Sequence, residues 1–235
     1  MSSMTSKQEE IVEWFNTTYS KRGSWYLRPR QAYYIYLELL QAGSNQKLLD
    51  VACGLGRLLD ASKAYGVQQY GIDISPVAIK KAKNLFPNFN LFVANAEKLP
   101  FDDAIFDLIT CIGSIERMLN KSLVFKEMLR VGKRNCRYCF LVRNSETRSW
   151  KFFKDFLGLK NKAGHQDAKT LKQWKDMFSL YGFKVNAIYP DQYPLQKQKQ
   201  RSGLWLKKIN FKKIIFSTRQ LEDANEFIFL LEKND

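Results

Sequence analysis

The sequence Leu48-Leu49-Asp50-Val51-Ala52-Cys53-Gly54-Leu55-Gly56 places a short apolar run directly before two closely spaced glycines. This pattern predicts a buried strand over 47–52 that ends in a tight turn, because glycine adopts backbone conformations that other residues avoid. The residues at 57–65 have the apolar spacing of a helix. In open parallel sheets a ligand binds beyond the carboxyl ends of the strands, so this turn is the first candidate for a binding site.

Strands and helices alternate after this turn. Predicted strands cover 68–73, 91–94, 105–112, 136–142, 183–189 and 226–231, and predicted helices cover 76–85, 122–131 and 171–180. Ser75 followed by Pro76 is typical of a helix start. Single helices between successive strands favour parallel pairing and right-handed crossovers, so the predicted fold is a doubly wound α/β sheet with helices on both faces.

The rest of the chain fits one domain over residues 1–235. Residues 1–44 carry helical patterns at 7–15 and 30–41, and residues 45–145 hold the regular alternation. Two stretches break that alternation: 145–169, which is rich in aromatic residues, and 191–222, which is rich in Lys and Arg and lies between the last two strands. We expect both stretches to be insertions into the sheet's normal connections.

The composition excludes a disordered chain and draws attention to charge. Hydrophobic residues make up 45% and aromatic residues 14%, while 38 Lys and Arg against 23 Asp and Glu give a net charge of +15. Residues 131–219 hold 21 of the basic residues and 5 of the acidic ones. This asymmetry indicates an anionic partner, which could be nucleic acid, a membrane surface or a phosphate-bearing substrate.

The amino terminus is polar, no window has the apolar length of a membrane span, and the four cysteines are sparse, so we expect a cytoplasmic protein. Cys136 and Cys139 lie three residues apart on a predicted strand, where side chains three apart point to opposite faces. We therefore expect no metal site there.

Three motifs follow the glycine turn: Tyr-Gly-Ile-Asp-Ile-Ser-Pro at 70–76, Ala-Asn-Ala-Glu-Lys-Leu-Pro-Phe at 94–101 and Phe-Asp-Leu-Ile at 106–109. Asp73 ends the second predicted strand, where a carboxylate can accept hydrogen bonds from ribose hydroxyls. Leu59 stands where a dinucleotide fingerprint would have its third glycine, which weighs against NAD. In this order and spacing, the motifs resemble those of class I S-adenosylmethionine-dependent methyltransferases that act on quinones, sterols, sugars and other small molecules.

The resemblance implies a Rossmann-like sheet of seven strands, mostly parallel with an antiparallel last strand, and S-adenosylmethionine as methyl donor, with S-adenosylhomocysteine as product. It assigns residues 1–44 to a helical lid, 45–145 to the cofactor-binding core, and 145–169 and 191–222 to the acceptor side. The cofactor-binding residues that it implies are Asp50, Ala52, Gly54, Gly56, Asp73, Ile74, Asn95, Ala96 and Ile112. Asn95 stands where the family more often has Asp, and Arg117 stands where many relatives have a histidine after Glu116.

The acceptor-side predictions come from chemistry-bearing residues near the predicted strand ends. His165, the single histidine, is a candidate general base, and Glu116 is a second candidate catalytic residue. The candidate substrate-binding residues are Arg117, Arg143, Asn144, Tyr19 and Tyr26. The alternative for His165 is an exposed loop position with no catalytic task. The alternative for the arginines is ordinary solvated charge at the strand ends.

These features predict in-line methyl transfer to a small-molecule, lipid or sugar acceptor, with oxygen as the first choice of atom and nitrogen or carbon left open. The segment 195–219 interleaves eight Lys and Arg with Trp, Leu, Ile and Phe. That composition suits a membrane surface or lipid-linked acceptor, which we prefer over RNA, although a solvated cover of the sheet edge fits as well. The alternatives are an RNA methyltransferase and a non-catalytic member of the family that binds the cofactor.

Overall fold

The computed structural model describes residues 6–22, 28–147, 167–191, 221 and 224–234. Seven strands form one sheet: β1 Lys47–Val51, β2 Gln68–Asp73, β3 Asn90–Val93, β4 Phe106–Ile112, β5 Gly132–Arg143, β6 Phe183–Asp191 and β7 Glu226–Lys233. The α-helices are α1 Ser6–Arg22, α2 Tyr34–Leu39, α3 Arg57–Ser62, α4 Pro76–Leu85, α5 Lys121–Val131 and α7 Leu171–Leu180. Three short 3-10 helices are η1 Arg30–Tyr33, η2 Lys63–Tyr65 and η3 Ile115–Arg117.

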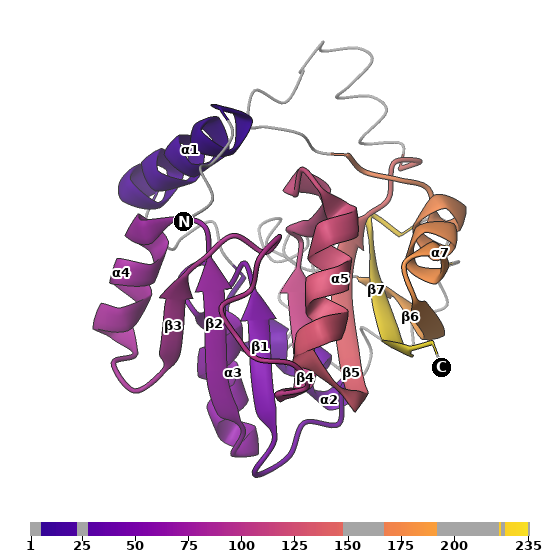
Figure 1. Cartoon of the computed structure of the whole chain (residues 1–235), viewed down its shortest axis with the longest axis horizontal. Helices are drawn as coiled ribbons and strands as arrows, with labels where there is room; N and C mark the ends of the chain where they lie inside the picture. Colours follow the sequence, from indigo (N-terminus) through magenta and orange to yellow (C-terminus); the bar gives the residue numbers. More distant parts are fainter. Residues whose placement is uncertain (1–5, 23–27, 148–166, 192–220, 222–223, 235) are drawn as a thin grey trace, which may run out of the picture.

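The sheet has the strand order β3-β2-β1-β4-β5-β7-β6 (Figure 1). β1 pairs in parallel with both β2 and β4, and β4 pairs in parallel with β5. β7 runs antiparallel to its two neighbours, β5 and β6. The predicted doubly wound, mostly parallel sheet with an antiparallel last strand is therefore confirmed, and its topological switch point lies between β1 and β4.

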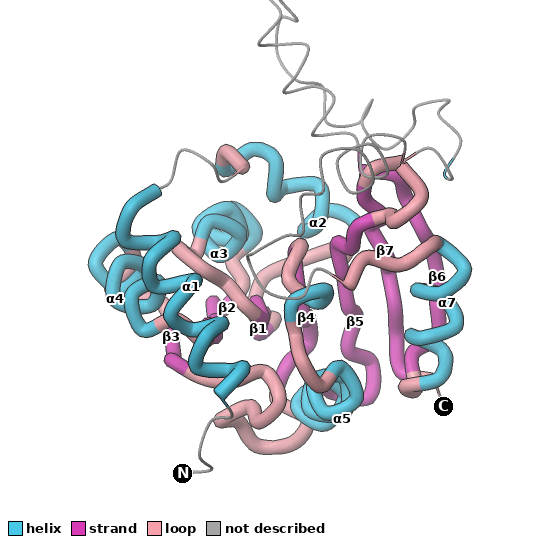
Figure 2. The backbone as a smooth tube through the Cα atoms, turned by 90° about the horizontal axis from the view of Figure 1, so that it is seen from above, coloured by secondary structure: helices cyan, strands magenta, loops and turns pink. Residues whose placement is uncertain are grey.

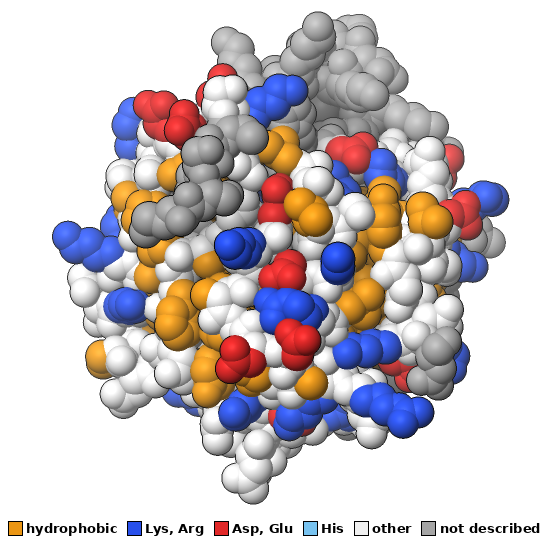
Figure 3. Space-filling model, in the orientation of Figure 1, with side chains coloured by type: hydrophobic (Ala, Val, Ile, Leu, Met, Phe, Trp, Pro, Cys, Tyr) orange, Lys and Arg blue, Asp and Glu red, His pale blue; other side chains and the backbone are white. Residues whose placement is uncertain are grey.

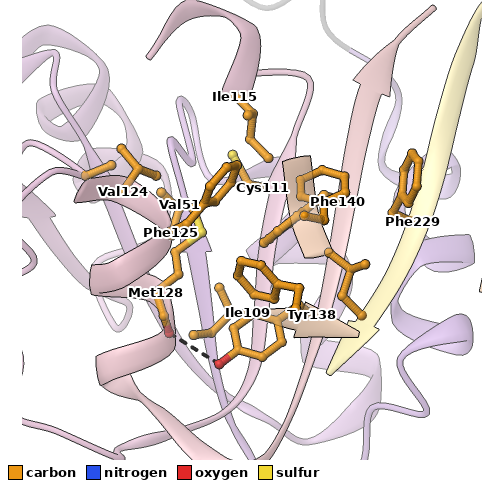
Figure 4. Close-up of a cluster of buried hydrophobic side chains, with 14 of the residues drawn as sticks. Val51, Ile109, Cys111, Ile115, Val124, Phe125, Met128, Tyr138, Phe140 and Phe229 are labelled. Atoms are coloured by element: carbon orange, nitrogen blue, oxygen red, sulfur yellow. Dashed lines mark hydrogen bonds between the residues drawn. The ribbon is translucent and has the colours of Figure 1, made fainter. Parts of the chain in front are cut away.

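One face of the sheet is covered by α5 and α7. Phe125 and Met128 of α5 are fully buried against Ile109 and Phe140 of the sheet, and the Tyr138 hydroxyl donates to the Met128 carbonyl at 3.4 Å (Figure 4). Trp174 of α7 is also fully buried in this cluster. Close packing of these large rings against the strands fixes the sheet in place.

The opposite face is covered by α2, α3 and α4 (Figure 2). Leu37 of α2, Leu59 of α3 and Ile79 of α4 pack with Leu48 and other strand residues in a second buried cluster. Leu48 lies in this cluster, whereas its neighbour Leu49 lies in the cluster under α5, as strand alternation requires. Burial of both faces explains why the strands are continuously apolar rather than alternating.

The same alternation separates the two cysteines of β5. Cys136 packs in the cluster under α5 and α7, and Cys139 packs in the cluster under α2, α3 and α4. Both are free thiols, and their side chains lie on opposite faces of the sheet, as predicted from strand alternation. Among the described residues there is no group of three or more His, Cys, Asp or Glu side chains placed to hold a metal ion.

Element types were predicted better than element ends. α1 continues to Arg22, seven residues beyond the predicted end, and β5 begins at Gly132 rather than Cys136. The predicted helix at 30–41 is a 3-10 turn followed by the short helix α2. The α4 start is confirmed in detail, because the Ser75 hydroxyl accepts from the Ala78 N–H at 3.1 Å and Pro76 occupies the first helical position.

On the face seen in Figure 3, Lys and Arg side chains are interspersed with Asp and Glu side chains and with hydrophobic ones. Of the 21 basic residues in 131–219, 13 belong to 148–166 and 192–220, outside the described residues. In the part of the chain that is described, no helix combines the length and apolar character that a membrane span needs.

Candidate functional site

The turn after β1 has an unusual backbone. Ala52, Gly54 and Gly56 all have positive φ angles, of 63°, 53° and 73°. Glycine adopts this region freely, but Ala52 pays a conformational cost of about 1 kcal/mol or more. The Gly56 N–H closes the turn onto the Cys53 carbonyl at 2.9 Å, and α3 begins at the next residue. The strand-turn-helix predicted from residues 47–65 is confirmed.

Asp73, at the end of β2, is held by two backbone donors. One carboxylate oxygen accepts from the Gly54 N–H at 2.9 Å and the other from the Ser75 N–H at 2.9 Å. Burial raises the pKa of Asp73 to about 6, although these hydrogen bonds act to lower it. Each carboxylate oxygen has a further lone pair, so Asp73 is fixed in position and can still accept from a ligand's hydroxyls.

Asp50, at the corresponding end of β1, has a different environment. Its side chain is buried and accepts a hydrogen bond from the Thr110 hydroxyl of β4 at 2.7 Å. Burial raises the pKa of Asp50 to about 7, and the neighbouring Asp73 acts in the same direction. Asp50 is therefore a carboxyl group that is partly protonated near neutral pH.

A pocket opens at these strand ends, directly above the switch point. Its walls come from α1, from the ends of β1 and β2, from the loop after β3 and from the segment after β4. The lining residues are Gln8, Ile11, Phe15, Tyr19, Ala52, Ile72, Asp73, Ile74, Ala94, Asn95, Ala96, Glu97, Ser114, Arg117, Met118 and Leu119. This is the position at which doubly wound sheets bind their ligands.

The pocket brings together part of the predicted cofactor set. Ala52, Asp73, Ile74, Asn95 and Ala96 line it. The remaining members, Asp50, Gly54, Gly56 and Ile112, are not among its lining residues, although Gly54 is bonded to Asp73 at its edge.

The loop after β3 contributes a second carboxylate that the sequence analysis did not assign. Glu97 accepts from the side-chain amide of Gln8 at 3.1 Å and from the Asn120 N–H at 3.2 Å. The Asn95 side-chain oxygen accepts from the Glu97 N–H at 3.0 Å. The motif at 94–101 was a signal for this loop, whereas nothing local in the sequence linked Gln8 to it.

Helix α1 lies across the carboxyl ends of the strands beside α4 (Figures 1 and 2). Besides the Gln8–Glu97 contact, the Ser75 hydroxyl donates to the Asn16 side-chain oxygen at 2.6 Å, and the Lys81 ammonium donates to the Tyr19 carbonyl at 2.6 Å. These three contacts fasten α1 over the pocket. α1 lies within residues 1–44, and whether it acts as the predicted helical lid stays a prediction.

Tyr19, a predicted substrate-binding residue, lies against the glycine turn. A methyl group added at Gly54 would lie 2.6 Å from the Tyr19 hydroxyl oxygen, so only glycine permits this approach. Tyr19 is also in the pocket lining and stacks on Phe15 with ring centroids 6.1 Å apart. The lid and the glycine turn therefore meet at the pocket wall.

Glu116, a predicted catalytic residue, is buried and is not among the residues that line the pocket. Its carboxylate accepts from the Arg143 N–H at 2.6 Å, and its carbonyl accepts from the Asp167 N–H at 3.2 Å. Glu116 therefore ties the segment after β4 to the end of β5 and to the segment at 167. This geometry favours a positioning task for Glu116 over direct contact with a substrate.

Arg117, a predicted substrate-binding residue, does line the pocket. Its Nη1 donates to the Gly113 carbonyl at 2.7 Å, and its guanidinium carbon lies 5.9 Å from the centre of the Phe15 ring. Burial, followed by the nearby charge of Arg143, lowers the pKa of Arg117.

The predicted substrate-binding residues at the end of β5, Arg143 and Asn144, make contacts with other parts of the fold. Arg143 lies 3.7 Å from the Glu226 carboxylate, and its carbonyl accepts from the Trp174 indole N–H at 2.9 Å. Asn144 is buried and donates to the Ala224 carbonyl at 2.9 Å. Neither Arg143 nor Asn144 is in the pocket lining, and His165 and Tyr26 lie outside the described residues.

Comparison with known proteins identifies the family to which this site belongs. Residues 49–140 match the family model described as a methyltransferase domain. Over these residues the chain matches a methyltransferase domain, and its sheet has the fold of class I methyltransferases. The family predicted from the motifs is confirmed.

Two curated relatives show the range within this family. The chain is 36% identical over 93 residues to norajmaline N-methyltransferase of Rauvolfia serpentina. The aligned region covers 37% of this chain and 32% of that protein. It is 40% identical over 95 residues to the chloroplastic tocopherol O-methyltransferase of Arabidopsis thaliana. That alignment covers 37% of this chain and 27% of that protein. The methyltransferase domain thus aligns with about a third of the length of these relatives.

Among solved structures, geranyl diphosphate C-methyltransferase of Streptomyces coelicolor A3(2), in complex with Mg²⁺, geranyl diphosphate and S-adenosylhomocysteine, has the same fold. Its TM-score is 0.68 at 16% identity, covering 99% of this chain and 100% of that chain. At this identity the likeness extends to the fold, and the seven-stranded arrangement predicted from the sequence is shared.

The residues that form the pocket and the adjoining glycine turn fit S-adenosylmethionine. Asp73 presents a fixed carboxylate for ribose hydroxyls, and the close approach between Gly54 and Tyr19 shows how little room a side chain would leave at the turn. The carboxylates of Asp73 and Glu97 in one lining also suit a ligand with a cationic sulfur.

Proposed function

We propose that this protein transfers a methyl group from S-adenosylmethionine to a small-molecule acceptor, with oxygen as the first expected atom. The observation that carries the proposal is the pocket at the switch point, where Asp73 is fixed by two backbone N–H groups beneath the helix α1. The relatives named above methylate nitrogen, oxygen and carbon according to their names, so the family alone leaves the acceptor atom open.

S-adenosylmethionine supplies a methyl group on a positively charged sulfur, and in-line transfer to a hydroxyl oxygen leaves S-adenosylhomocysteine and a proton. The chain's task is then to orient two ligands and exclude water. Asp73 and the loop at Asn95 and Ala96 hold the nucleoside end. Helix α1, fastened at Glu97, Ser75 and Lys81, closes the pocket from above.

A general base is needed when the acceptor is a hydroxyl, and we propose His165 for this task. If it accepts the proton, His165→Ala lowers kcat strongly and leaves the Kd for S-adenosylhomocysteine unchanged. Steady-state kinetics and calorimetry on the same variant check this. Unchanged turnover would remove His165 from the mechanism.

The acceptor class is tested by methyl transfer from labelled S-adenosylmethionine to separate extracts of phenols and hydroquinones, amines, polar lipids and RNA. We expect label in the small-molecule or lipid fractions, and none with Asp73→Ala. Label in RNA alone would favour the alternative in which the basic segment 195–219 binds RNA, and the binding would then weaken steeply with added salt. No label in any fraction, together with intact cofactor binding, would favour a non-catalytic member.

The basic segment also underlies a proposal about location. Its Lys and Arg residues alternate with large apolar residues, a composition that suits a cytoplasmic protein in peripheral contact with a membrane. Co-sedimentation with anionic vesicles, compared with neutral vesicles, tests this contact.

A further inference from the structure

Arg117 differs from Arg28, another largely buried arginine, in having no ion pair with a carboxylate among the described residues. Arg28 is paired with Asp191 and Glu226. Within the described residues no ion pair involves Arg117, and its Nε is buried with no hydrogen-bond partner. A buried guanidinium with an unused donor is costly unless something else satisfies it.

The nearest carboxylate is already used elsewhere. Glu116 accepts from the Arg143 N–H at 2.6 Å and lies outside the pocket lining. Arg143 itself is engaged with Glu226 at 3.7 Å, so it is not the arginine that faces the pocket. The positive charge among the lining residues after β4 therefore belongs to Arg117. Within the described residues it has no ion pair, although Glu116 and Glu226 act to raise its pKa against the effect of burial.

The surroundings of Arg117 in the pocket are mostly apolar. Ile11, Phe15, Met118 and Leu119 line the same pocket, and the Arg117 guanidinium carbon lies 5.9 Å from the centre of the Phe15 ring. The two carboxylates of the lining come from Asp73, at the end of β2, and from Glu97, in the loop after β3, which also accepts from the Asn120 N–H at 3.2 Å. Among the lining residues that follow β4, Arg117 carries the one charge, and Met118 and Leu119 beside it are apolar.

We propose that Arg117 binds an anionic group, a carboxylate or a phosphate, on an otherwise apolar acceptor. The proposal rests on the function proposed above and names the substrate class for the same site. An anion in the pocket would receive N–H donors from the planar guanidinium fork of Arg117, which within the described residues has no carboxylate in an ion pair with it. S-adenosylmethionine also carries a carboxylate, so the test must distinguish an acid on the acceptor from the acid of the cofactor.

The experiment is calorimetric titration of the S-adenosylhomocysteine-saturated protein with three probes that share a six-carbon chain: hexyl phosphate, hexanoate and 1-hexanol. We expect the two anions to bind about tenfold or more tightly than 1-hexanol. Arg117→Gln should abolish this preference while leaving 1-hexanol binding and the Kd for S-adenosylhomocysteine unchanged. Arg117→Lys, which keeps the charge and loses the fork, should retain part of the preference.

Arg137→Gln is the matched control, because Arg137 is a partly exposed arginine that is not in the pocket lining and donates to Gln41. It should leave all three affinities unchanged. Circular dichroism confirms that each variant is folded before titration.

Three results would overturn the proposal. The first is equal binding of anions and 1-hexanol to the wild type. The second is an unchanged anion preference in Arg117→Gln. The third is a loss of S-adenosylhomocysteine binding in Arg117→Gln, which would assign Arg117 to the cofactor's carboxylate.

The same titrations without S-adenosylhomocysteine separate this proposal from the proposed function. Anion binding that depends on Arg117 supports the acceptor site even if the wild type fails to bind S-adenosylhomocysteine. That failure would count against the methyltransferase function alone.

Discussion

Asp50 and Asp73 lie buried at the ends of neighbouring strands, and burial raises the pKa of each, to about 7 and about 6. A raised pKa means that the folded state favours the protonated carboxyl. This contribution to the free energy of unfolding is fully present below about pH 4, near the unfolded pKa, and it is lost as the pH rises through the folded pKa. The site therefore holds two carboxylates whose ionised forms the fold disfavours. Burying these ionised carboxylates lowers the free energy of unfolding, and binding of a ligand at the site can offset that loss.

Asp50→Asn should raise stability at high pH. An amide still accepts the Thr110 hydrogen bond, and it removes the cost of a buried charge. We expect the advantage of Asp50→Asn over the wild type in free energy of unfolding to be about 2 kcal/mol larger at pH 8 than at pH 5.5. Urea unfolding at the two pH values measures this.

Asp107→Asn is the control for that comparison. Hydrogen bonds from Lys133 and the Lys47 N–H lower the pKa of Asp107 against the effect of burial. Its contribution is therefore present above about pH 4 and does not change between pH 5.5 and 8. A difference between Asp50→Asn and the wild type that stays constant with pH would contradict the assignment of Asp50.

Gly54→Ala should disturb both fold and ligand binding. Its φ of 53° strains any side chain, and the new methyl would lie 2.6 Å from the Tyr19 hydroxyl. We expect a loss of about 1–2 kcal/mol in stability and weaker binding of S-adenosylhomocysteine. Thermal denaturation and calorimetry measure the two effects.

Gly43→Ala provides the matched glycine, because an added methyl meets nothing within 4 Å and no positive φ is involved. It should leave both quantities nearly unchanged. If the contact with Tyr19 is responsible, Tyr19→Phe in the Gly54→Ala background should restore part of the loss. Equal effects of the two glycine substitutions would contradict the account of the turn.

At the scale of elements, a few polar contacts hold α1 over the pocket, and our proposal gives this helix the task of closing it. Lys81→Ala removes the donor to the Tyr19 carbonyl, so the carboxyl end of α1 should detach more often. We expect S-adenosylhomocysteine to dissociate several-fold faster, with little change in melting temperature. Stopped-flow displacement measures the rate. The control is Lys83→Ala, because Lys83 is an exposed lysine on α4, the helix that also carries Lys81. Equal dissociation rates in Lys81→Ala and the wild type would show that this contact does not hold the lid.

Elements whose signal is local were predictable from the sequence. The turn at 52–56 and the α4 start at Ser75 and Pro76 each depend on a few adjacent residues, and both were found. The extension of α1 to Arg22 was missed, because it depends on contacts of Tyr19 with Leu55 and Ala78, which are distant in sequence. Glu97 and Gln8 were missed as partners for the same reason, since 89 positions separate them.

At the scale of the whole molecule, a buried ion cluster joins the segment after α1 to the antiparallel end of the sheet. Arg28 lies 2.5 Å from both Asp191 of β6 and Glu226 of β7, and it donates to the Tyr36 hydroxyl at 3.0 Å. Burial would lower the pKa of Arg28, but Asp191 and its other partners raise it. Burial raises the pKa of Glu226 despite Arg28. No sequence pattern links residues 28, 191 and 226, so this cluster could not be predicted.

Arg28→Met should destabilise the molecule strongly, because it leaves two buried carboxylates without their cation. We expect a loss of about 3–5 kcal/mol in the free energy of unfolding. Lys133→Ala breaks a more exposed pair with Asp107 and should cost about 1 kcal/mol or less. Chemical denaturation of both variants checks the difference, and similar losses would contradict the structural importance of the cluster.

The central claim is that the pocket above the switch point binds the cofactor through Asp73. The most direct test is calorimetric titration of S-adenosylhomocysteine into the wild type and Asp73→Ala at pH 7.5, with folding checked by circular dichroism. Our account predicts one binding site in the wild type and affinity at least about tenfold weaker in the variant. Absence of binding to the folded wild type, or equal affinity in the two proteins, would contradict it.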